Sequence, residues 1–406
     1  DVSALVLDIG AHTVRAGYAG DDAPKTIFTS SYGYRDETTP PAEEGGQPTT
    51  TRKVWVGDHG PALWRANQEV GSPFVEGNLE DFTYVPNLIN HAFVENLRCD
   101  PSDHPVLSTE PAWNTPANRE RMAEILFEEF KIPAFYIANS GVLSAFAAGR
   151  GTALIVDIGS HWSSVVPVVD GFVLRKGVQR SSLGALQRYS SHQILHRRGV
   201  QLISHQLIAS KMPVPPETPP RIQLREDRRA TTTKSWNDWS ATREMEEWIA
   251  AVGGVYDVSW TTQQQIPRPG KQYEFPSGYS SVFHAERYLP GEGYFMQDAL
   301  GPIGNVPPTL SQLLHTSIAA CEPDLKAQLL QTVVLTGGGS LLVGFPERLN
   351  TEMNKIWPGK VKLSASGNSI ERQYSAWIGG SILASLGTFH QLWISRAEYQ
   401  EHGKDI

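Results

Sequence analysis

Apolar runs interrupted by glycine-containing turns recur along the chain, and two of these patterns are nearly the same. One reads ALVLDIGAHTVRAGYAG from Ala4, and the other reads ALIVDIGSHWSSVVPVVDG from Ala153. Each is a strand-like run, an Asp-Ile-Gly, a small residue, a His and a second run rich in β-branched residues, which is typical of two strands joined by a tight turn. The sequence therefore predicts the same hairpin twice, with a histidine at each tip.

A helical pattern lies between the two hairpins. Thr115 and Pro116 are residue types favoured just before a helix and at its first position. Apolar residues then recur on one helical face, at Met122, Ile125, Leu126 and Phe130. We expect this stripe to pack against a sheet.

Further helices are predicted around and after the second hairpin. ANSGVLSAFAAGRG leads into it, and SAWIGGSILASLGTF is too short and too rich in glycine to span a bilayer, so it predicts a buried helix. Another helix starts at Thr309 and has one apolar face, formed by Leu310, Leu313, Leu314 and Ile318. A strand, the triple glycine Gly337–Gly339 and a helix come after it.

Two stretches lack a regular apolar pattern. YGYRDETTPPAEEGGQPTTTRK, from Tyr32, is rich in Pro, Gly, Thr and charge, and predicts a mobile loop. Residues 184–302 shift towards Gln, Arg, Trp and Pro, with MPVPPETPPR and REDRRATTTKSWNDW expected as loops and with helices of moderate length around them. This shift predicts a separate, less regular subdomain. We interpret the run Arg225–Arg229 as a solvated face, with a histone or DNA contact as the minor alternative.

The length and the net charge of the chain limit the number of lobes and the kinds of partner that we expect. A chain of 406 residues exceeds what one core usually organises, which favours two lobes around a cleft. The formal charge of −8, without a basic face, disfavours strong direct binding of nucleic acid but not a basic protein partner. Cys99 and Cys321 are the only cysteines, which fits buried thiols in a reducing compartment such as cytosol or nucleus. We find no signal peptide and expect no membrane partner.

The duplicated hairpins suit a phosphate bound with a metal ion. A strand that ends in Asp before a glycine turn presents backbone N–H groups to an anion and a carboxylate to hydrated Mg²⁺. Asp8 and Asp157 hold these positions, and Gly337–Gly339 forms a third turn suited to close approach of a ligand. Asp-Ile-Gly also makes ordinary turns, so a purely structural duplication is the alternative. Three such turns together favour nucleotide binding.

This constellation resembles the actin, Hsp70 and sugar-kinase superfamily. AGYAGDDAPK, TEPAWNTPANRERM, TGGGSLLVGFPERL and IERQYSAWIGGSILASLGTFHQLWISRAEYQEHG are similar to actin, and they cover most of both ends of the chain. The resemblance implies an α/β, actin-like duplicated fold with two lobes, four subdomains and a nucleotide cleft between the lobes. It places the first lobe at 1–147 and 375–406, with subdomain 2 at about 31–70. The second lobe would be 148–374, with a divergent subdomain 4 at about 184–302.

The resemblance also implies a site for ATP and Mg²⁺, with ADP or an empty cleft left open. Asp8 and Asp157 would hold the water shell of the metal, and Arg15 stands where actin has a phosphate-contacting lysine. The other expected contacts are Gly10, Ala11, His12, Thr13, Gly159, Ser160, His161, Gly337, Gly338, Gly339, Leu342 and Gln373. Leu342 and Gln373 replace an aromatic residue and a lysine of actin, so the adenine end is altered.

The residues that position and activate water in actin-like ATPases are replaced. Ser140 stands in place of a Gln, Ser160 of an Asp and Ser164 of a His. Loss of one acid–base group typically lowers a rate by about 10²–10⁴, so we expect ATP binding without useful hydrolysis and no catalytic residue. The alternatives are an active ATPase or small-molecule kinase of this superfamily, and a polymerising cytoskeletal protein.

His12 and His161 occupy hairpin positions where actin has glycines. Each ring either hydrogen-bonds a neighbouring loop or contacts the terminal phosphate and changes nucleotide preference. A transition-metal site of these two histidines with Asp8 and Asp157 is a third interpretation.

TEPAWN, KQYEFPSGYSSVFHAERYLP and GTFHQLW are most similar to the nuclear actin-related proteins of chromatin remodelling and histone acetyltransferase complexes. This likeness implies a nuclear structural subunit in transcription regulation and DNA repair. Its partners would be monomeric actin and a long helix of a remodeller ATPase or acetyltransferase scaffold, bound in an apolar groove of the C-terminal segment, with histones left open. Because DETTPPAEEGGQPTT and GEGYFMQDALGPIGN replace two filament contacts of actin, we expect no homopolymer.

Overall fold

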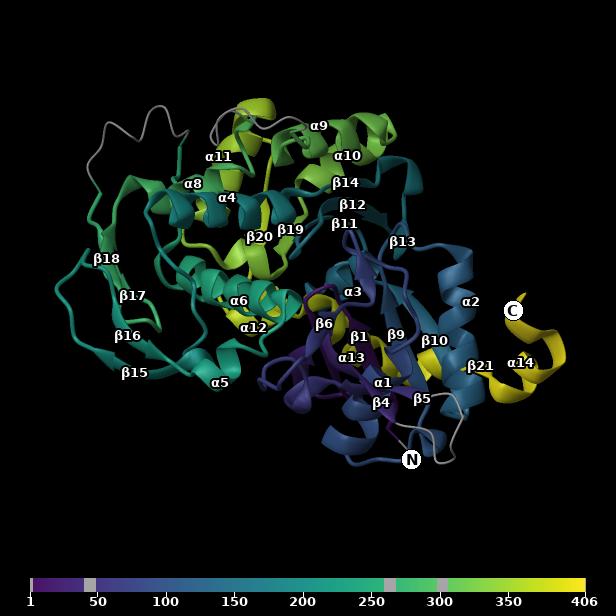
Figure 1. The fold of residues 1–406 in the computed structure, drawn as a ribbon. Coiled ribbons are helices and arrows are strands. Elements are labelled where there is room, and N and C mark those ends of the chain that lie inside the picture. Colours follow the sequence, from purple (N-terminus) through teal and green to yellow (C-terminus); the bar gives the residue numbers. More distant parts are fainter. Residues whose placement is uncertain (1–2, 40–48, 259–267, 298–305, 406) are drawn as a thin grey trace.

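The computed structural model describes residues 3–39, 49–258, 268–297 and 306–405. Two six-stranded sheets form its centre, and helices cover their faces (Figure 1). The order of the first sheet is β21 (Ile394–Ser395), β10 (Ala134–Asn139), β9 (Val106–Glu110), β1 (Leu5–Ile9), β2 (Thr13–Tyr18) and β3 (Thr26–Thr29). The second sheet runs β13 (Phe172–Val173), β12 (Ser163–Val169), β11 (Ala153–Ile158), β19 (Val333–Thr336) and β20 (Leu363–Ala365), with β14 (Gln179–Ser181) also on β12.

The duplicated hairpin is present in both sheets. β1 pairs with β2 and β11 pairs with β12, both antiparallel, so that Asp8 lies opposite Arg15 and Asp157 lies opposite Ser164. Both turns close with the same hydrogen bond, from the backbone N–H of the turn glycine to a carbonyl three residues on, at 3.0 Å in each. β1 is also parallel to β9, as β11 is to β19. The predicted repeat is therefore confirmed, together with the α/β class.

The helices agree with the local signals. Thr115 accepts a hydrogen bond from the Asn118 N–H and caps α2 (Pro116–Glu124), whose pattern continues through a π-helical turn at Ile125–Glu129. Thr309 forms a capping box with Gln312 at the start of its helix. The remaining helices on the two sheets are α1 (Val85–Asn90), α3 (Ser140–Ala147), α9 (Leu310–Ala320), α10 (Pro323–Leu330), α11 (Phe345–Ile356), α12 (Ser369–Gln373), α13 (Ser375–Ser385) and α14 (Arg396–His402).

The predicted buried helix is α13, and it lies directly on α3. A Cβ atom at Gly379 would be 1.8 Å from the carbonyl oxygen of Leu143, so the two backbones touch where only a glycine fits. Trp377 is fully buried beside them and donates from its indole N–H to the Val6 carbonyl at 3.1 Å. This packing joins the C-terminal segment to the first sheet.

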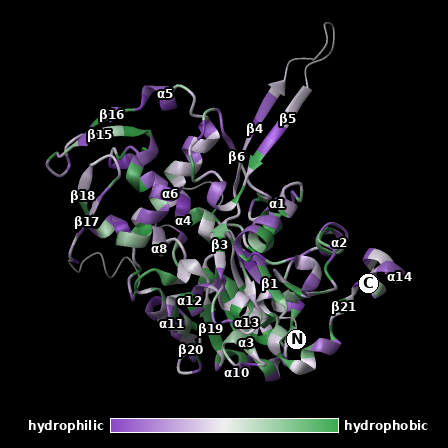
Figure 2. Cartoon of the chain, turned by 90° about the horizontal axis from the view of Figure 1, so that it is seen from below, coloured by the Kyte–Doolittle hydropathy of each residue, from purple (hydrophilic) through white to green (hydrophobic). Residues whose placement is uncertain are grey.

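The prediction of a mobile loop from Tyr32 is wrong at both ends of that stretch, which form strands. β4 (Tyr32–Thr39) pairs with β5 (Thr49–Trp55), and β6 (Glu69–Gly71) pairs with β4, in a hairpin that projects from the body (Figure 2). Its charged residues pair across the strands, as Arg52 does with Asp36 at 2.6 and 2.8 Å, so burial is not what orders them. Residues 40–48, the centre of the predicted loop, lie outside the described residues.

The segment after 184 contains its own small core. α4 (Leu183–Arg197), α6 (Lys234–Val252) and the hairpins β15 (Ile208–Met212)–β16 (Arg221–Leu224) and β17 (Lys271–Glu274)–β18 (Ser280–Phe283) build it, with α5 (Glu226–Arg229) and α8 (Leu289–Glu292). The loop expected through Trp239 is wrong from Lys234 onward, because Thr233 caps α6 there and buried Trp236 donates to the Pro61 carbonyl. Arg225 to Arg229 is mainly exposed, as expected for a solvated face.

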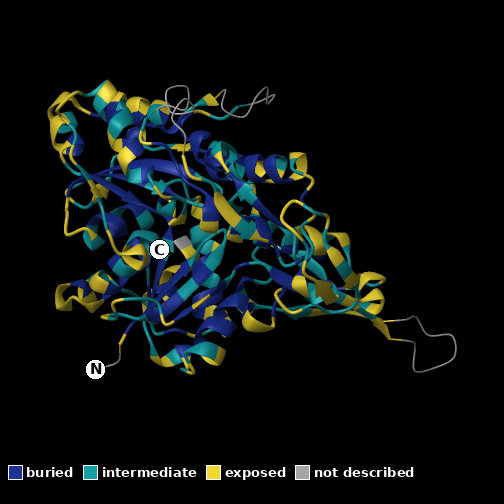
Figure 3. Ribbon diagram, turned by 90° about the vertical axis from the view of Figure 1, so that its left-hand side faces the viewer, coloured by how far each residue is buried: buried dark blue, intermediate teal, exposed yellow. Residues whose placement is uncertain are grey.

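Burial is concentrated in the two sheets and the helices on them, and the projecting hairpin is mostly exposed (Figure 3). Cys99 and Cys321 are unpaired, and burial raises the pKa of both thiols. Across the described ranges, none of the helices combines the length and the apolar character that crossing a membrane requires. The lobe boundaries at 147/148 and 374/375 stay a prediction.

Candidate functional site

A cavity of about 1030 Å³ lies between the two sheets. Its walls come from both hairpin turns, from the turn after β19 and from α4, α6 and α12. Of the predicted nucleotide contacts, the cavity brings together Asp8, Gly10, Ala11, His12, Arg15, Asp157, Gly159, Ser160, His161, Gly337, Gly338, Gly339, Leu342 and Gln373. Thr13 is not part of this lining, because its hydroxyl is turned into the protein, where it is buried without a hydrogen-bond partner among the described residues.

Asp8 is held by two neighbours at the end of β1. One carboxylate oxygen accepts from Arg15 at 2.5 Å, and the other accepts from the Thr109 hydroxyl at 2.6 Å. The Arg15 guanidinium also lies 5.1 Å from the centre of the Tyr374 ring. The carboxylate is therefore fixed in orientation, and Arg15, expected in place of a lysine of actin, neutralises it.

Asp157 lies at the same end of the second hairpin. Burial, and to a lesser extent the charge of Asp8, raises the pKa of Asp157 to about 6, while Arg15 opposes the shift. A Cβ atom at Gly337 would be 2.3 Å from an oxygen of Asp157, so this position requires glycine, as its φ of 91° also does. The charge of Arg15 acts on both Asp8 and Asp157, so one negative charge of the pair stays uncompensated. Carboxylate oxygens are the ligands that a hydrated divalent ion prefers, so these two residues fit Mg²⁺.

The described residues contain no group of three or more His, Cys, Asp or Glu side chains arranged to hold a metal ion. The transition-metal interpretation of the two histidines and two aspartates therefore has no support. A Mg²⁺ ion bound through water needs fewer direct protein ligands.

His12 contacts helix α6. Arg243 donates to its Nε2 at 2.9 Å, and Glu246 lies 3.7 Å from its Nδ1. Burial, followed by the charges of Arg243, Arg188 and Arg15, lowers the pKa of His12 to about 4. His12 is thus hydrogen-bonded to a neighbouring element, as the simpler interpretation expected, but this element is helix α6 and not a loop.

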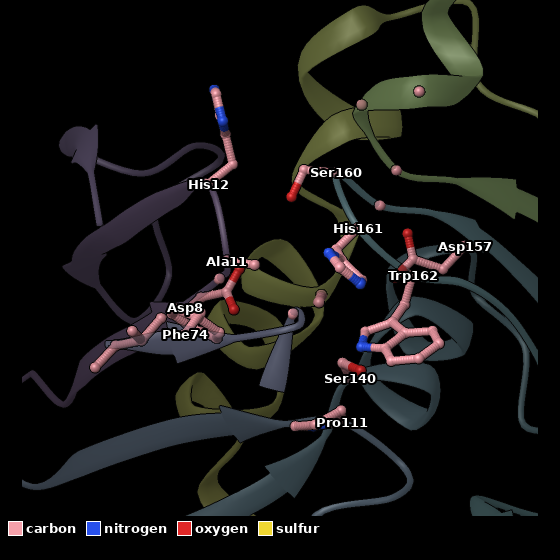
Figure 4. Close-up of a pocket in the computed structure, with 18 of the residues that line it drawn as sticks. Asp8, Ala11, His12, Phe74, Pro111, Ser140, Asp157, Ser160, His161 and Trp162 are labelled. Atoms are coloured by element: carbon pink, nitrogen blue, oxygen red, sulfur yellow. The ribbon is translucent and has the colours of Figure 1, made fainter. Parts of the chain in front are cut away.

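His161 lies deeper between the sheets. Figure 4 shows its ring pointing into the pocket, between Asp8 and Trp162, whereas the ring of His12 points away from them. The ring centre is 5.1 Å from that of Trp162, and burial lowers the pKa of His161. The sequence predicts a histidine at this hairpin tip, and the fold shows that its side chain lines the cavity.

The three serines expected in place of the water-handling residues of actin lie in different places. Ser140 and Ser160 line the cavity, and Ser164 is buried in β12 opposite Asp157. A serine hydroxyl does not take up a proton near neutral pH, so none of the three supplies a general base. The cavity thus brings together the residues expected to bind a nucleotide, and none of these three serines offers an acid–base group.

Two features of the lining were missed by the sequence analysis. The Arg180 guanidinium lies 5.0 Å from the Trp113 ring and 4.3 Å from the Trp162 ring, and it donates to Asn78 at 2.8 Å, so β14 is tied to β8 (Asn78–Leu79). Arg188 of α4 also lines the cavity. The only signal for the first feature is a tryptophan in each of TEPAWN and SHWSS, which are far apart in sequence.

The comparisons with known proteins agree with this geometry. The family model for actin matches residues 1–406. Three similar relatives are each named actin-related protein 4: that of Yarrowia lipolytica is 37% identical over 413 residues, covering 100% of this chain and 95% of the relative. The Schizosaccharomyces pombe relative is 35% identical, with 100% and 96% covered, and that of Oryza sativa subsp. indica is 34% identical, with 99% and 97% covered. With a full-length match, the duplicated hairpins and the cleft between two sheets, this chain belongs to the actin family.

Proposed function

We propose that this chain is a structural, nucleotide-binding subunit of nuclear chromatin remodelling and/or histone acetyltransferase complexes, and that it does not hydrolyse ATP appreciably. One observation carries the nucleotide part of the proposal. The same cleft holds Asp8, Asp157 and the glycine turns, and it is lined by Ser140 and Ser160, two of the three serines expected in place of the water-handling residues of actin. A protein that binds ATP in such a cleft without hydrolysing it would use ATP as a structural ligand.

The lining supports one orientation of the nucleotide. Asp8 and Asp157 would hold the waters of Mg²⁺, and the backbone N–H groups of the two hairpin turns would bind phosphate oxygens. Leu342 and Gln373 lie beside the turn Gly337–Gly339, at the end suited to the base. When bound, Mg²⁺ would neutralise the negative charge of the phosphates.

Binding and turnover are tested on the purified chain. Mg-ATP should raise the melting temperature, because a ligand held only by the folded state stabilises it by about 2.7 kcal/mol at 100 times its dissociation constant. Phosphate release should stay at the level of a protein-free blank. Filamentous actin serves as the positive control, and turnover comparable to it would show that the chain is an active ATPase.

For partners, we propose monomeric actin and a long helix of a remodeller ATPase or acetyltransferase scaffold. Support comes from apolar side chains exposed at and beyond the end of α13, namely Ile382, Leu386 and Leu392. An amphipathic helix buries such side chains, and basic residues on it would be attracted by the net charge of −8. Histones stay a further candidate, and the proposed location is the nucleus.

The partner proposal is tested by co-expression with actin and such a helix. Leu386→Asp should abolish the complex, because it places a charge in the apolar contact. Leu63→Asp is the matched control, since Leu63 is similarly exposed in another part of the chain. Equal assembly of both variants would contradict this mode of binding.

We also propose that the chain does not polymerise by itself. The parts that depart from actin include the projecting hairpin β4–β5 and the segment from Gly291, of which residues 298–305 lie outside the described residues. Sedimentation in polymerising salt, with actin run in parallel, should leave this chain in the supernatant. Pelleting to the same extent as actin would favour the cytoskeletal alternative.

A further inference from the structure

Arg188 differs from the other two arginines that line the cavity. Arg15 is paired with Asp8, and Arg180 donates to Asn78 between two tryptophan rings. Among the residues that the structure describes, Arg188 has no hydrogen bond and no ion pair within 4.0 Å. The cleft thus contains one arginine whose charge is not taken up by a protein group in the described part of the chain.

The fold places Arg188 over the tip of the second hairpin. The first turn of α4 lies directly on this tip, since the N–H groups of Gly184 and Ala185 donate to the His161 carbonyl at 3.1 and 3.4 Å. A Cβ atom at Gly184 would be 2.5 Å from the Gly159 carbonyl oxygen. Arg188 is four residues further on the same helical face, and side chains in a helix lean towards its N-terminus. In agreement with this lean, Arg188 lines the same cavity as Ser160 and His161 of the hairpin tip.

Both hairpin tips lie within the electrostatic reach of this guanidinium. After burial, Arg188 is among the charges that lower the pKa of His12 and of His161. Protonation of either imidazole, which would add to the positive charge, is therefore disfavoured. Glu246 is the nearby acid, and Arg188 lowers its pKa, but Glu246 lies against His12 and Arg243.

We propose that Arg188 binds the terminal phosphate of a nucleoside triphosphate held between the two hairpins, and so makes the cleft prefer the triphosphate over the diphosphate. This inference rests on the proposed nucleotide binding. A planar guanidinium offers two parallel N–H donors to phosphate oxygens, and such charge-assisted pairs are stronger than neutral hydrogen bonds. His161, which lines the same cavity, offers a further hydrogen-bonding group.

The test is calorimetric titration of the full chain with Mg-ATP and Mg-ADP. Wild type should bind ATP more tightly than ADP. Arg188→Gln should weaken ATP binding by about 10- to 100-fold and change ADP binding less than about twofold, since a hydrogen bond to a charged group is at stake. Arg188→Lys should be intermediate, because it keeps a point charge without the paired donors. Arg197→Gln, at the exposed end of α4, is the matched control and should behave as wild type.

The outcomes separate the two proposals. If wild type binds neither nucleotide, the proposed function is wrong and this inference is wrong with it. If wild type binds both and Arg188→Gln weakens both equally or neither, only the assignment of Arg188 is wrong. If inorganic phosphate alone binds the protein with the same dependence on Arg188, the residue serves a free phosphate ion and the assignment to a nucleotide is overturned.

Discussion

Gly77 and His161 touch across the cleft so closely that a Cβ atom at Gly77 would lie 2.5 Å from Cγ of His161. Gly77 is in the two-residue turn between β7 (Phe74–Val75) and β8, where Glu76 and Gly77 both have positive φ. This is the backbone of a tight hairpin turn that favours glycine. A turn on the side of the first sheet is thus fitted against the tip of a hairpin in the second.

Gly77→Ala should therefore destabilise the protein by about 1–3 kcal/mol, from backbone strain at positive φ and from the contact with His161. Thermal and urea unfolding measure this loss. The double variant Gly77→Ala/His161→Gly should recover the part due to the contact but not the strain. Strictly additive effects would show that the two residues do not interact.

The stacked guanidinium of Arg180 should depend on its planar shape as well as its charge. Arg180→Lys keeps the charge but loses the contact with Trp113 and Trp162, so unfolding free energy should fall by about 1 kcal/mol. Arg175→Lys, at an exposed position in the same sheet region, is the control and should be neutral. Denaturant unfolding compares the two, and an Arg180→Lys protein as stable as wild type would contradict the role of stacking.

Glu244 should make stability depend on pH. It is buried in α6, and neither carboxylate oxygen has a hydrogen-bond partner among the described residues. Burial, aided by the charge of Glu247, raises the pKa of Glu244 to about 7, and the nearby Ile203 amide opposes this only in part. Because the folded state holds the proton more tightly than the unfolded state, stability contributed by Glu244 is lost as pH rises from about 4.5 to about 7.

Glu244→Gln removes this titration. Above pH 7 the variant should be more stable than wild type, by up to about 3 kcal/mol, and the difference should shrink at acid pH. Thermal melts from acid to alkaline pH measure the two curves. Glu247→Gln, which changes an exposed neighbour, should alter the curve only slightly. Parallel curves for wild type and Glu244→Gln would rule out this titration.

Asp157→Asn should separate stability from ligand binding. It removes a charge that desolvation disfavours and that Asp8 repels, so the nucleotide-free protein should melt at a higher temperature. The same change removes one of the two carboxylates proposed to hold the Mg²⁺ waters, so EDTA should no longer affect ATP binding. Calorimetry with and without EDTA measures this, with wild type expected to lose affinity when Mg²⁺ is removed. An unchanged response to EDTA would show that Asp157 does not serve the metal.

The sequence by itself determined the features that depend only on residues close together along the chain. The repeated hairpin, the caps at Thr115 and Thr309 and the glycine turn at Gly337 follow from residues within a few positions, because turn closure and capping are local interactions. The likeness to actin, which rests on the same local motifs, also predicted most of the residues that line the cleft.

Tertiary structure decided what depends on distant residues. β4 and β5 form because their side chains pair across the strands, and α6 includes Trp236 because a pocket beside Pro61 accepts it, although the composition of both segments is typical of loops. Likewise, no local pattern distinguishes Arg188 from other helical arginines. Its charge, which has no ion-pair partner among the described residues, comes to line the same cavity as the two hairpin tips only when α4 packs on a turn more than twenty residues earlier in the chain. The reason is that the free energy of a charged group depends on everything that surrounds it.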